Sequence, residues 1–182
     1  MPGQIHIYYG DGKGKTTAAV GLAVRAAGAG KKVLFSQFVK AAEAREAGEW
    51  PLSSEIKVLE GMPNVTVKVL GRGFVGILGD RKLHEAHVQA ARAGLKWLKG
   101  EIESGKYQVV IADELVSALE LELLTVEEVG ELYGMRDKFE ALALTGHRKY
   151  NELTDGADLV TEMKMVKHPY YQGTIAQRGI DY

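Results

Sequence analysis

The sequence has no cysteine among its 182 residues, which excludes disulfide bonds and thiolate metal sites. It has no apolar run long enough to cross a membrane, and its start does not read as a secretory signal. An excess of one charge is also missing, because 23 Lys and Arg stand against 24 Asp and Glu, and nothing in this balance calls for nucleic acid. We therefore expect a cytoplasmic protein with neither a membrane nor a nucleic-acid partner.

The composition is that of an ordinary folded protein. Apolar residues make up 46% of the chain and charged residues 26%, which is enough to build a buried core beneath a charged surface. The sequence shows no internal repeat and no low-complexity tract. We expect residues 1–182 to form a single nucleotide-binding domain.

The most informative segment is a glycine-rich turn at residues 10–17. It follows an apolar, strand-like run at residues 5–9 and precedes a helical pattern that extends from Thr16 to about Ala29. This order predicts a phosphate loop, in which backbone N–H groups and a helix N-terminus bind phosphate oxygens. The lysine of Gly14-Lys15-Thr16 would add a positive charge, and the threonine hydroxyl could hold magnesium. The predicted ATP contacts are Gly10, Asp11, Gly12, Lys13, Gly14, Lys15, Thr16 and Thr17.

The loop is one residue shorter than the pattern G-x-x-x-x-G-K-[ST]. The pattern requires a glycine five residues before Gly14, where Tyr9 stands, and Gly10 is only four residues before it. The simpler alternative is a glycine-rich turn with solvated lysines, but the strand and helix around the turn favour phosphate binding. A dinucleotide fingerprint fits less well, because G-x-G-x-x-G would need a glycine at Lys15.

Strand-like and helical patterns alternate along the rest of the chain. A helix is expected from Arg81 to about Ser104, capped by Asp80, with apolar positions from Leu83 to Ile102 at helical spacing, and another helix opens at the capping box Thr125–Glu128. A helical or irregular stretch is expected between Phe38 and Pro51. Further strands are predicted at residues 32–38, 65–70, 108–112, 139–145 and 158–164.

This alternation predicts an α/β fold with a mostly parallel sheet and helices on both faces. Ligands of such sheets bind at the carboxyl ends of the strands. We therefore expect the loops after residues 9, 38, 70, 112 and 145 to converge on one crevice.

Two acids, Asp113 and Glu114, end the apolar run at residues 109–112. A carboxylate there could reach magnesium on a bound triphosphate, whereas the alternative is a strand that ends in solvated acids. The phosphate loop favours the metal interpretation. Because adjacent strand residues point in opposite directions, we expect one of the two acids to meet the metal, and the pattern leaves open which one.

Two further loops allow two interpretations each. The segment at residues 71–79 contains four glycines and several apolar residues, so it suits either a lid over a partly apolar substrate or a surface loop that covers the core. The turn Thr145-Gly146-His147-Arg148 follows a predicted strand. Arg148 could contact phosphate there, or it could be solvated.

At these residues the chain resembles the P-loop class of ATP:cob(I)alamin (corrinoid) adenosyltransferases. The segment at residues 10–19 is similar to that family's short phosphate loop. Further similarity lies in Gln37-Phe38-Val39-Lys40, Asp113-Glu114-Leu115, Thr145-Gly146 and the C-terminal segments at residues 157–162, 166–169 and 179–182.

The resemblance implies a RecA-like P-loop NTPase fold, usually a homodimer, and one reaction. The cobalt of a reduced corrinoid, such as cob(I)alamin, attacks the 5′-carbon of ATP, triphosphate leaves, and adenosylcobalamin forms in cobalamin synthesis or salvage. Magnesium or manganese assists, and a reductant, often a flavoprotein, supplies Co(I).

The resemblance also implies roles for individual residues. Lys15 and Glu114 are the expected catalytic residues, and Thr16 with Asp113 or Glu114 would hold the metal. Phe74 corresponds to an aromatic residue that borders the corrin and keeps a lower axial ligand off cobalt. Two positions depart from the family, since Gly76 stands where tryptophan is common and His147 where arginine is usual.

Two other functions remain possible from the sequence. A P-loop ATPase or kinase of another kind would release ADP, and a regulatory module would bind ATP without turnover. The C-terminal segments that resemble the adenosyltransferases favour the transferase, because a generic NTPase does not need them.

Overall fold

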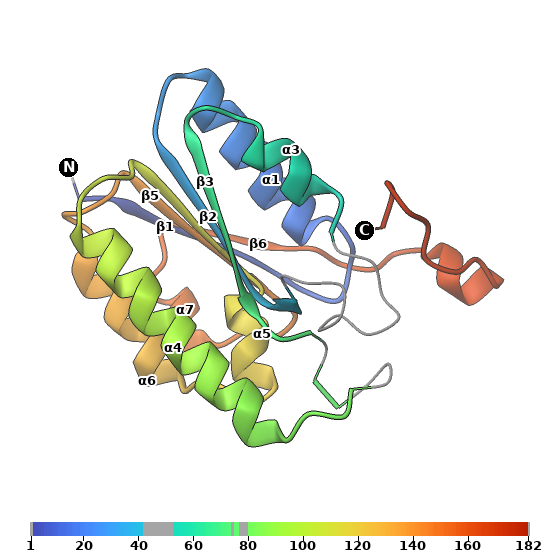
Figure 1. Ribbon diagram of the computed structural model, residues 1–182. Helices are drawn as coiled ribbons and strands as arrows, with labels where there is room; N and C mark the ends of the chain where they lie inside the picture. The colour runs from blue at the N-terminus through green and yellow to red at the C-terminus, as the bar shows by residue number, and fades with distance from the viewer. Residues whose placement is uncertain (1, 42–52, 74, 77–79, 182) are drawn as a thin grey trace.

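The computed structural model describes residues 2–41, 53–73, 75–76 and 80–181. Their centre is a six-stranded sheet with the order β3-β2-β4-β5-β1-β6, in which every pair of neighbours is parallel (Figure 1). The strands are β1 (Gln4–Tyr9), β2 (Val33–Ala41), β3 (Val65–Gly71), β4 (Val109–Asp113), β5 (Ala141–Gly146) and β6 (Leu159–Glu162).

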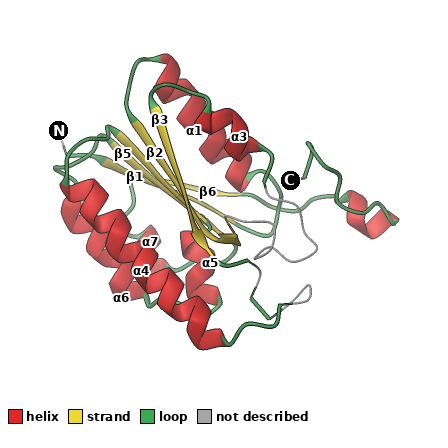
Figure 2. Cartoon of the chain, viewed as in Figure 1, coloured by secondary structure: helices red, strands yellow, loops and turns green. Residues whose placement is uncertain are grey.

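Helices cover both faces of this sheet (Figure 2). One face carries α1 (Lys15–Gly28) and α3 (Glu55–Glu60), and the other carries α4 (His84–Glu103), α5 (Leu115–Glu120), α6 (Val126–Gly130) and α7 (Asn151–Thr154). Two 3₁₀ helices, η1 (Glu131–Met135) and η2 (Pro169–Gln172), complete the described elements. The predicted α/β class, with a parallel sheet between two helical layers, is therefore confirmed.

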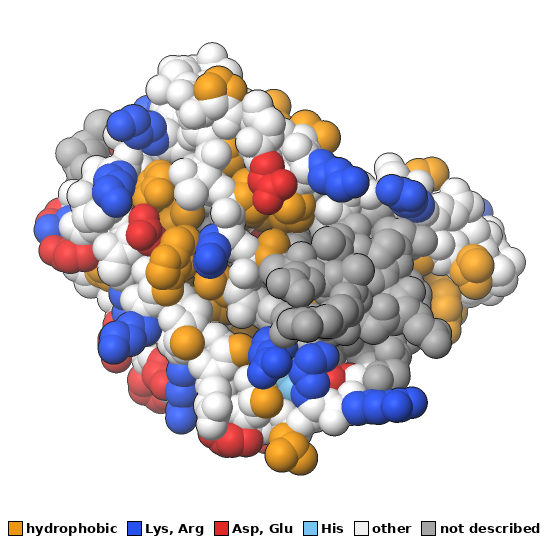
Figure 3. Space-filling view, in the orientation of Figure 1, with side chains coloured by type: hydrophobic (Ala, Val, Ile, Leu, Met, Phe, Trp, Pro, Cys, Tyr) orange, Lys and Arg blue, Asp and Glu red, His pale blue; other side chains and the backbone are white. Residues whose placement is uncertain are grey.

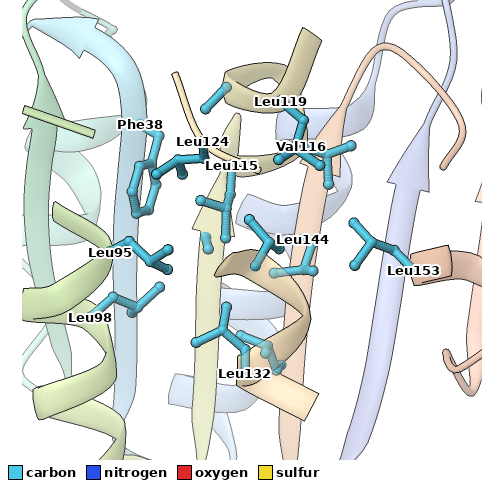
Figure 4. Close-up of a cluster of buried hydrophobic side chains, with 14 of the residues drawn as sticks. Phe38, Leu95, Leu98, Leu115, Val116, Leu119, Leu124, Leu132, Leu144 and Leu153 are labelled. Carbon is cyan, nitrogen blue, oxygen red and sulfur yellow. The ribbon is translucent and has the colours of Figure 1, made fainter. Parts of the chain in front are cut away.

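The strands divide their apolar side chains between two cores. Along β2, Leu34 packs into the cluster under α4 to α7, while Val33 and Phe35 pack into the cluster under α1. This alternation follows from the two-residue period of a strand, and it makes both faces of the central strands apolar, as parallel sheets require. The larger cluster, drawn in Figure 4, includes Phe38, Leu95, Leu98, Leu115, Val116, Leu119, Leu124, Leu132, Leu144 and Leu153.

The long helix α4 begins later than the sequence predicted, and Asp80 does not cap it. The helix starts at His84, and its N-cap position is Leu83, which makes no side-chain cap and is 80% exposed. Asp80 instead accepts hydrogen bonds from Gly76 N (3.0 Å), Lys82 N (3.1 Å) and His87 Nε2 (2.9 Å). The carboxylate therefore ties the preceding loop to the first turns of α4, and these bonds take the place of a helix cap.

Strand β2 is longer than predicted because it contains a bulge. Gln37 pairs with Val69 and Ala41 pairs with Gly71, so β2 takes four steps where β3 takes two. Within the bulge Val39 has φ 65°, a left-handed conformation that a β-branched residue rarely adopts. Such a backbone conformation costs on the order of 1–3 kcal/mol and persists only where the surrounding structure enforces it.

The remaining predicted elements lie within a few residues of the observed ones. The capping box is present, with Thr125 Oγ1 accepting from Glu128 N and Glu128 Oε2 accepting from Thr125 N. The predicted stretch between residues 38 and 51 is β2 as far as Ala41, and its remainder lies outside the described residues. In the described ranges no helix combines the length and apolarity that a membrane crossing needs.

Side chains of both charges are interspersed with apolar ones on the face drawn in Figure 3. This distribution agrees with the formal net charge of −1.

The buried carboxyl of Asp80 predicts how stability depends on pH. Burial favours the neutral form of this group, but the hydrogen bonds from Gly76 N, Lys82 N and His87 outweigh burial and lower the pKa of Asp80 to about 2. A carboxylate whose pKa is lower in the folded protein stabilises the fold above its ordinary pKa, and this contribution disappears as the pH falls through the folded value.

Asp80→Asn should therefore unfold more easily than the natural protein at about pH 5, and the difference should shrink as the pH approaches 2. Urea denaturation over this range measures the difference in the free energy of unfolding. Asp137→Asn, at a carboxylate that is 71% exposed, is the matched control and should change little. A difference for Asp80→Asn that stays constant down to about pH 2.5 would contradict this assignment.

Candidate functional site

The glycine-rich turn between β1 and α1 has the backbone of an anion-binding loop. Gly10 (φ 122°) and Gly14 (φ 109°) occupy conformations that residues with a side chain rarely adopt, and α1 begins directly after the second of them, at Lys15. The helix N-terminus and its free N–H groups therefore face the turn, which is the arrangement that favours phosphate. The turn and the helix start thus lie at the residues expected for a phosphate loop, while their contact with phosphate stays a prediction.

The Lys15 side chain is buried inside this loop. Its Nζ donates to the carbonyl oxygens of Gly10 (2.7 Å) and Gly12 (2.9 Å). Burial lowers the pKa of Lys15, and the carboxylates of Glu114, Asp11 and Asp113 oppose that shift. The ammonium is therefore held at the centre of the turn, and a phosphate group that enters the loop can replace the two carbonyls as its partner.

A cleft of about 790 Å³ opens in front of the loop. Its walls come from the carboxyl ends of four strands, through Lys15 after β1, Lys40 in the bulge of β2, Glu114 after β4 and His147 after β5. Four of the five predicted loops therefore converge on one crevice, as expected for a parallel sheet. The loop after residue 70 adds no described residue to the lining. The remaining lining residues are Lys13, Gly14, Thr16, Thr17, Val20, Ser54, Glu55, Val58, Gly179, Ile180 and Asp181.

The two acids after β4 have different environments. Asp113 is fully buried, and its carboxylate accepts from Thr16 Oγ1 (3.3 Å), Gln37 Nε2 (3.0 Å) and Thr145 Oγ1 (2.8 Å). A buried carboxylate needs such donors, because an unpaired one would be strongly destabilising. These three bonds connect α1, β2 and β5 to the end of β4. Glu114, in contrast, lines the cleft.

Thr145 fixes both acids at once. Its hydroxyl donates to Asp113 Oδ1 and accepts from the backbone N–H of Glu114 (2.8 Å), and Thr145 itself is fully buried. Glu114 has φ 61°, a left-handed conformation that is uncommon outside glycine. The bond from Glu114 N to Thr145 holds this backbone turn and directs the chain so that Glu114 borders the cleft.

The first three loop residues contact the C-terminal segment and are not among the residues that line the cleft. Gly12 N donates to Met163 O (2.7 Å), and Asp11 Oδ1 accepts from Met165 N (3.2 Å). A Cβ on Gly10 would lie 2.3 Å from Met163 O, so a side chain at that position would displace this contact. Gly10, Asp11 and Gly12 therefore shape the loop, and their predicted contact with ATP stays a prediction.

The chain end returns to the cleft after leaving the sheet. Beyond β6 the chain runs outward through η2 and comes back toward the ends of α1 and α3 that are nearest the cleft (Figure 1). There Asp181 forms an ion pair with Lys13, and Gly179 and Ile180 add to the lining. The C-terminal segment thus contacts the phosphate loop at two separated points.

The turn after β5 separates its two basic residues. His147 lines the cleft, and its backbone carbonyl accepts from Gly10 N (3.0 Å). Arg148 Nε pairs with Glu120 Oε1 on α5 (2.9 Å) and is not among the lining residues. The residue at the position where the resemblance expects arginine is therefore the one next to the loop, while Arg148 is bound elsewhere.

The arrangement suits a divalent cation bound together with a triphosphate. Magnesium is usually held by one or two carboxylates, phosphate oxygens and water, and the Thr16 hydroxyl and the Asp113 and Glu114 carboxylates are oxygen donors of that kind. No group of three or more His, Asp or Glu side chains in the described ranges could hold a metal alone.

Sequence reasoning missed several residues of this site. Thr145 and Gln37 hold Asp113, and Lys40 and Asp181 line the cleft. The first three stand at the carboxyl end of a strand, and all four lie in segments that resemble the family (residues 37–40, 145–146 and 179–182), so both features were signals that could have been used. Phe74, the predicted corrin-bordering residue, lies outside the described residues.

Comparison with known proteins identifies the family. The model of the ATP:corrinoid adenosyltransferases BtuR/CobO/CobP matches residues 1–182. The chain belongs to this family. It is 35% identical to the corrinoid adenosyltransferase of Escherichia coli K12 over 180 residues, covering 99% of this chain and 86% of that one.

Two further relatives match the chain over nearly the same length. The corrinoid adenosyltransferase CobA of Salmonella typhimurium LT2 is 36% identical over 180 residues, with 99% of this chain and 86% of that one covered. The enzyme of Pseudomonas aeruginosa PAO1 is 31% identical over 181 residues, covering 99% and 84%. Among solved structures, ATPases 2 and 3 of EssC from Geobacillus thermodenitrificans share 14% identity at a TM-score of 0.47, over 98% of this chain and 35% of that one.

Removal of the Thr145 hydroxyl should destabilise the protein, although it removes a single oxygen atom, because that atom makes two buried hydrogen bonds. Thr145→Val keeps the shape but leaves Glu114 N and one Asp113 oxygen without their partner, which should lower the free energy of unfolding by about 1–3 kcal/mol. Thr145→Ser restores the hydroxyl and should recover most of the loss in urea denaturation. Thr154→Val, which removes a long hydroxyl contact (3.3 Å) in α7, is the control with a smaller expected loss. Equal losses at both threonines would contradict the role of Thr145.

Proposed function

We propose that this chain transfers the 5′-deoxyadenosyl group of ATP to the cobalt of a reduced corrinoid such as cob(I)alamin. Co(I) attacks C5′ of the ribose with its electron pair, a Co–C bond forms, and the bond between C5′ and the α-phosphate oxygen breaks. Triphosphate leaves with the bonding electrons, and cobalt is formally oxidised from Co(I) to Co(III). The nucleophile belongs to the substrate, so the protein needs no Ser–His pair and no activated water.

One observation supports this proposal most strongly. Lys15, Thr16 and Glu114 line the same cleft, and the chain belongs to this family. Negative charge develops on the triphosphate as C5′–O breaks, so the task of the protein is to bind and stabilise a polyanion. Lys15 and the N–H groups of the loop do so directly. Lys13 adds a second ammonium once triphosphate competes with Asp181 for it.

Asp113 and Glu114 take separate roles in this proposal. Asp113 accepts a hydrogen bond from the Thr16 hydroxyl, which leaves the lone pairs of that oxygen free to face the cleft. Glu114 lines the cleft and is the acid nearer to a bound nucleotide. Mg²⁺ or Mn²⁺, held by Thr16 and one of these acids, would supply neutralisation of the charge on the leaving triphosphate.

Partners of the reaction follow from its chemistry and from the family. Co(I) must be supplied by a one-electron reductant, for which a flavoprotein is suitable, and the enzyme is expected to work as a homodimer. Phe74 is proposed to border the corrin and to keep a lower axial ligand off cobalt, which would make Co(II) easier to reduce.

The product of ATP cleavage tests the proposal. Under anaerobic conditions the protein, magnesium, ATP and chemically reduced cobalamin should give the absorption spectrum of an alkylcobalamin together with one equivalent of triphosphate. An ATPase or kinase would release ADP instead, and a regulatory module would leave ATP intact. Either of these results, without alkylation of cobalt, would refute the proposal.

Lys15→Ala should lower the rate of adenosylation by about 100-fold or more, because both the charge in the loop and the ordering of the turn are lost. The rate is measured with chemically reduced cobalamin at saturating and at limiting ATP. Lys31→Ala is the matched control, since Lys31 pairs with Glu140 and does not line the cleft. Near-normal turnover of Lys15→Ala would show that this lysine does not serve the reaction.

Phe74→Ala should slow reduction of Co(II) more than transfer from Co(I) that is supplied chemically. The two rates are measured in separate assays, one with an enzymatic reductant and one with a strong chemical reductant. If both rates fall by the same factor, the aromatic ring has no special effect on the cobalt ligand.

A further inference from the structure

We propose that Lys40 is a phosphate-binding residue on the wall of the cleft formed by β2, and that the bulge at Val39 places it there. This inference rests on the proposed function, because it assumes that the cleft receives the triphosphate of ATP. It adds one binding residue outside the phosphate loop, together with the backbone feature that positions it.

The argument begins with the faces of β2. Leu34 and Phe38 pack into the cluster under α4, as expected for residues an even number of steps apart. If the strand continued regularly, Lys40 would point to the same side and would meet the apolar core. Instead Val39 packs against that cluster directly after Phe38, so the alternation is interrupted at this position.

The interruption comes from the left-handed conformation of Val39. Val39 has φ 65° and lies within the bulge, where β2 has extra residues between Gln37 and Ala41 relative to β3. The bulge rotates the chain that follows it. Lys40 thereby turns away from the α4 face and lines the cleft with residues of α1 and α3.

Two contacts with β3 and the loop after it enforce the strained backbone. Val39 O accepts from Gly73 N (3.0 Å), and the backbone of Gly71 lies so close that an added Cβ would be 2.3 Å from Val39 C and 2.4 Å from Lys40 O. An unfavourable conformation that the surroundings enforce is typical of a functional position. Here it determines the direction of a single charged side chain.

The positions of the lysines around the cleft indicate what Lys40 binds. Among the described residues, the cleft is lined by the lysines Lys13, Lys15 and Lys40 and by the acids Glu55, Glu114 and Asp181. Lys40 Nζ donates to the hydroxyl of Ser53 (3.1 Å), a neutral partner that leaves the ammonium charge available to an anion. Since Lys13 and Lys15 belong to the loop and Lys40 to β2, a polyphosphate between them would be bound from two sides.

Inorganic triphosphate, the leaving group itself, is the probe that tests this inference. We expect Lys40→Met, which keeps most of the side-chain length but removes the charge, to bind triphosphate about 10-fold more weakly in calorimetry with magnesium present. Lys40→Arg should stay within a few-fold of the natural protein. Lys31→Met, outside the cleft, is the matched control and should bind normally.

Gly71→Ala tests the role of the bulge. The added methyl group would collide with Val39 and Lys40, so triphosphate binding should weaken although Lys40 is present, while circular dichroism confirms an intact fold. Gly100→Ala, where a Cβ would meet nothing within 4 Å, is the matched control.

Triphosphate binding by Lys40→Met at the natural affinity would overturn the inference, and normal binding by a folded Gly71→Ala would overturn the role of the bulge. Neither result would contradict the proposed function, because that function is tested separately by whether the natural protein forms an alkylcobalamin and releases triphosphate. Failure of that reaction would refute the proposed function itself.

Discussion

The site depends on one buried carboxylate. Asp113 has no solvent exposure and accepts hydrogen bonds from side chains on α1, β2 and β5. Transfer of an ionised group from water into the core is unfavourable unless its oxygens are well paired, so these three donors and the carboxylate require one another. Thr16, Gln37 and Thr145 are consequently held in one arrangement, which aligns the start of α1 with the ends of three neighbouring strands.

This arrangement supports the proposal that a short loop binds the nucleotide. The turn between β1 and α1 is one residue shorter than the general phosphate-loop pattern, yet Lys15 is buried at its centre and the helix begins directly behind it. Gly10 and Gly12 lie against the backbone of Met163, so the turn is supported by the C-terminal segment as well as by α1. The loop is therefore pre-shaped for an anion and needs little reordering to bind one.

The features that the sequence predicted are those set by short-range pattern. The parallel sheet follows from alternating apolar runs and helices, and the position of the phosphate loop follows from Gly14-Lys15-Thr16 between a strand and a helix. The capping box at Thr125 is equally local and was predicted correctly. Such features need only neighbouring residues to be recognised.

The features that were missed depend on contacts between distant segments. Asp80 is an exception, because its partners Gly76 and His87 are near in sequence, but the residues before α4 form a loop and the pattern does not show that the carboxylate bonds across it. The bulge at Val39 exists because Gly71, on another strand, leaves room for it. Whether Asp113 or Glu114 is buried could not be decided from the sequence, since it depends on the hydroxyl of Thr145 on a different strand.

A crystal structure of the enzyme with ATP and magnesium tests the central claim most directly. The account predicts the triphosphate inside the turn of residues 10–17, with Lys15 Nζ moved from the carbonyls of Gly10 and Gly12 to a phosphate oxygen and C5′ facing open space for the corrinoid. If Lys15 remained on those carbonyls while ATP bound with its triphosphate elsewhere, the account would be contradicted.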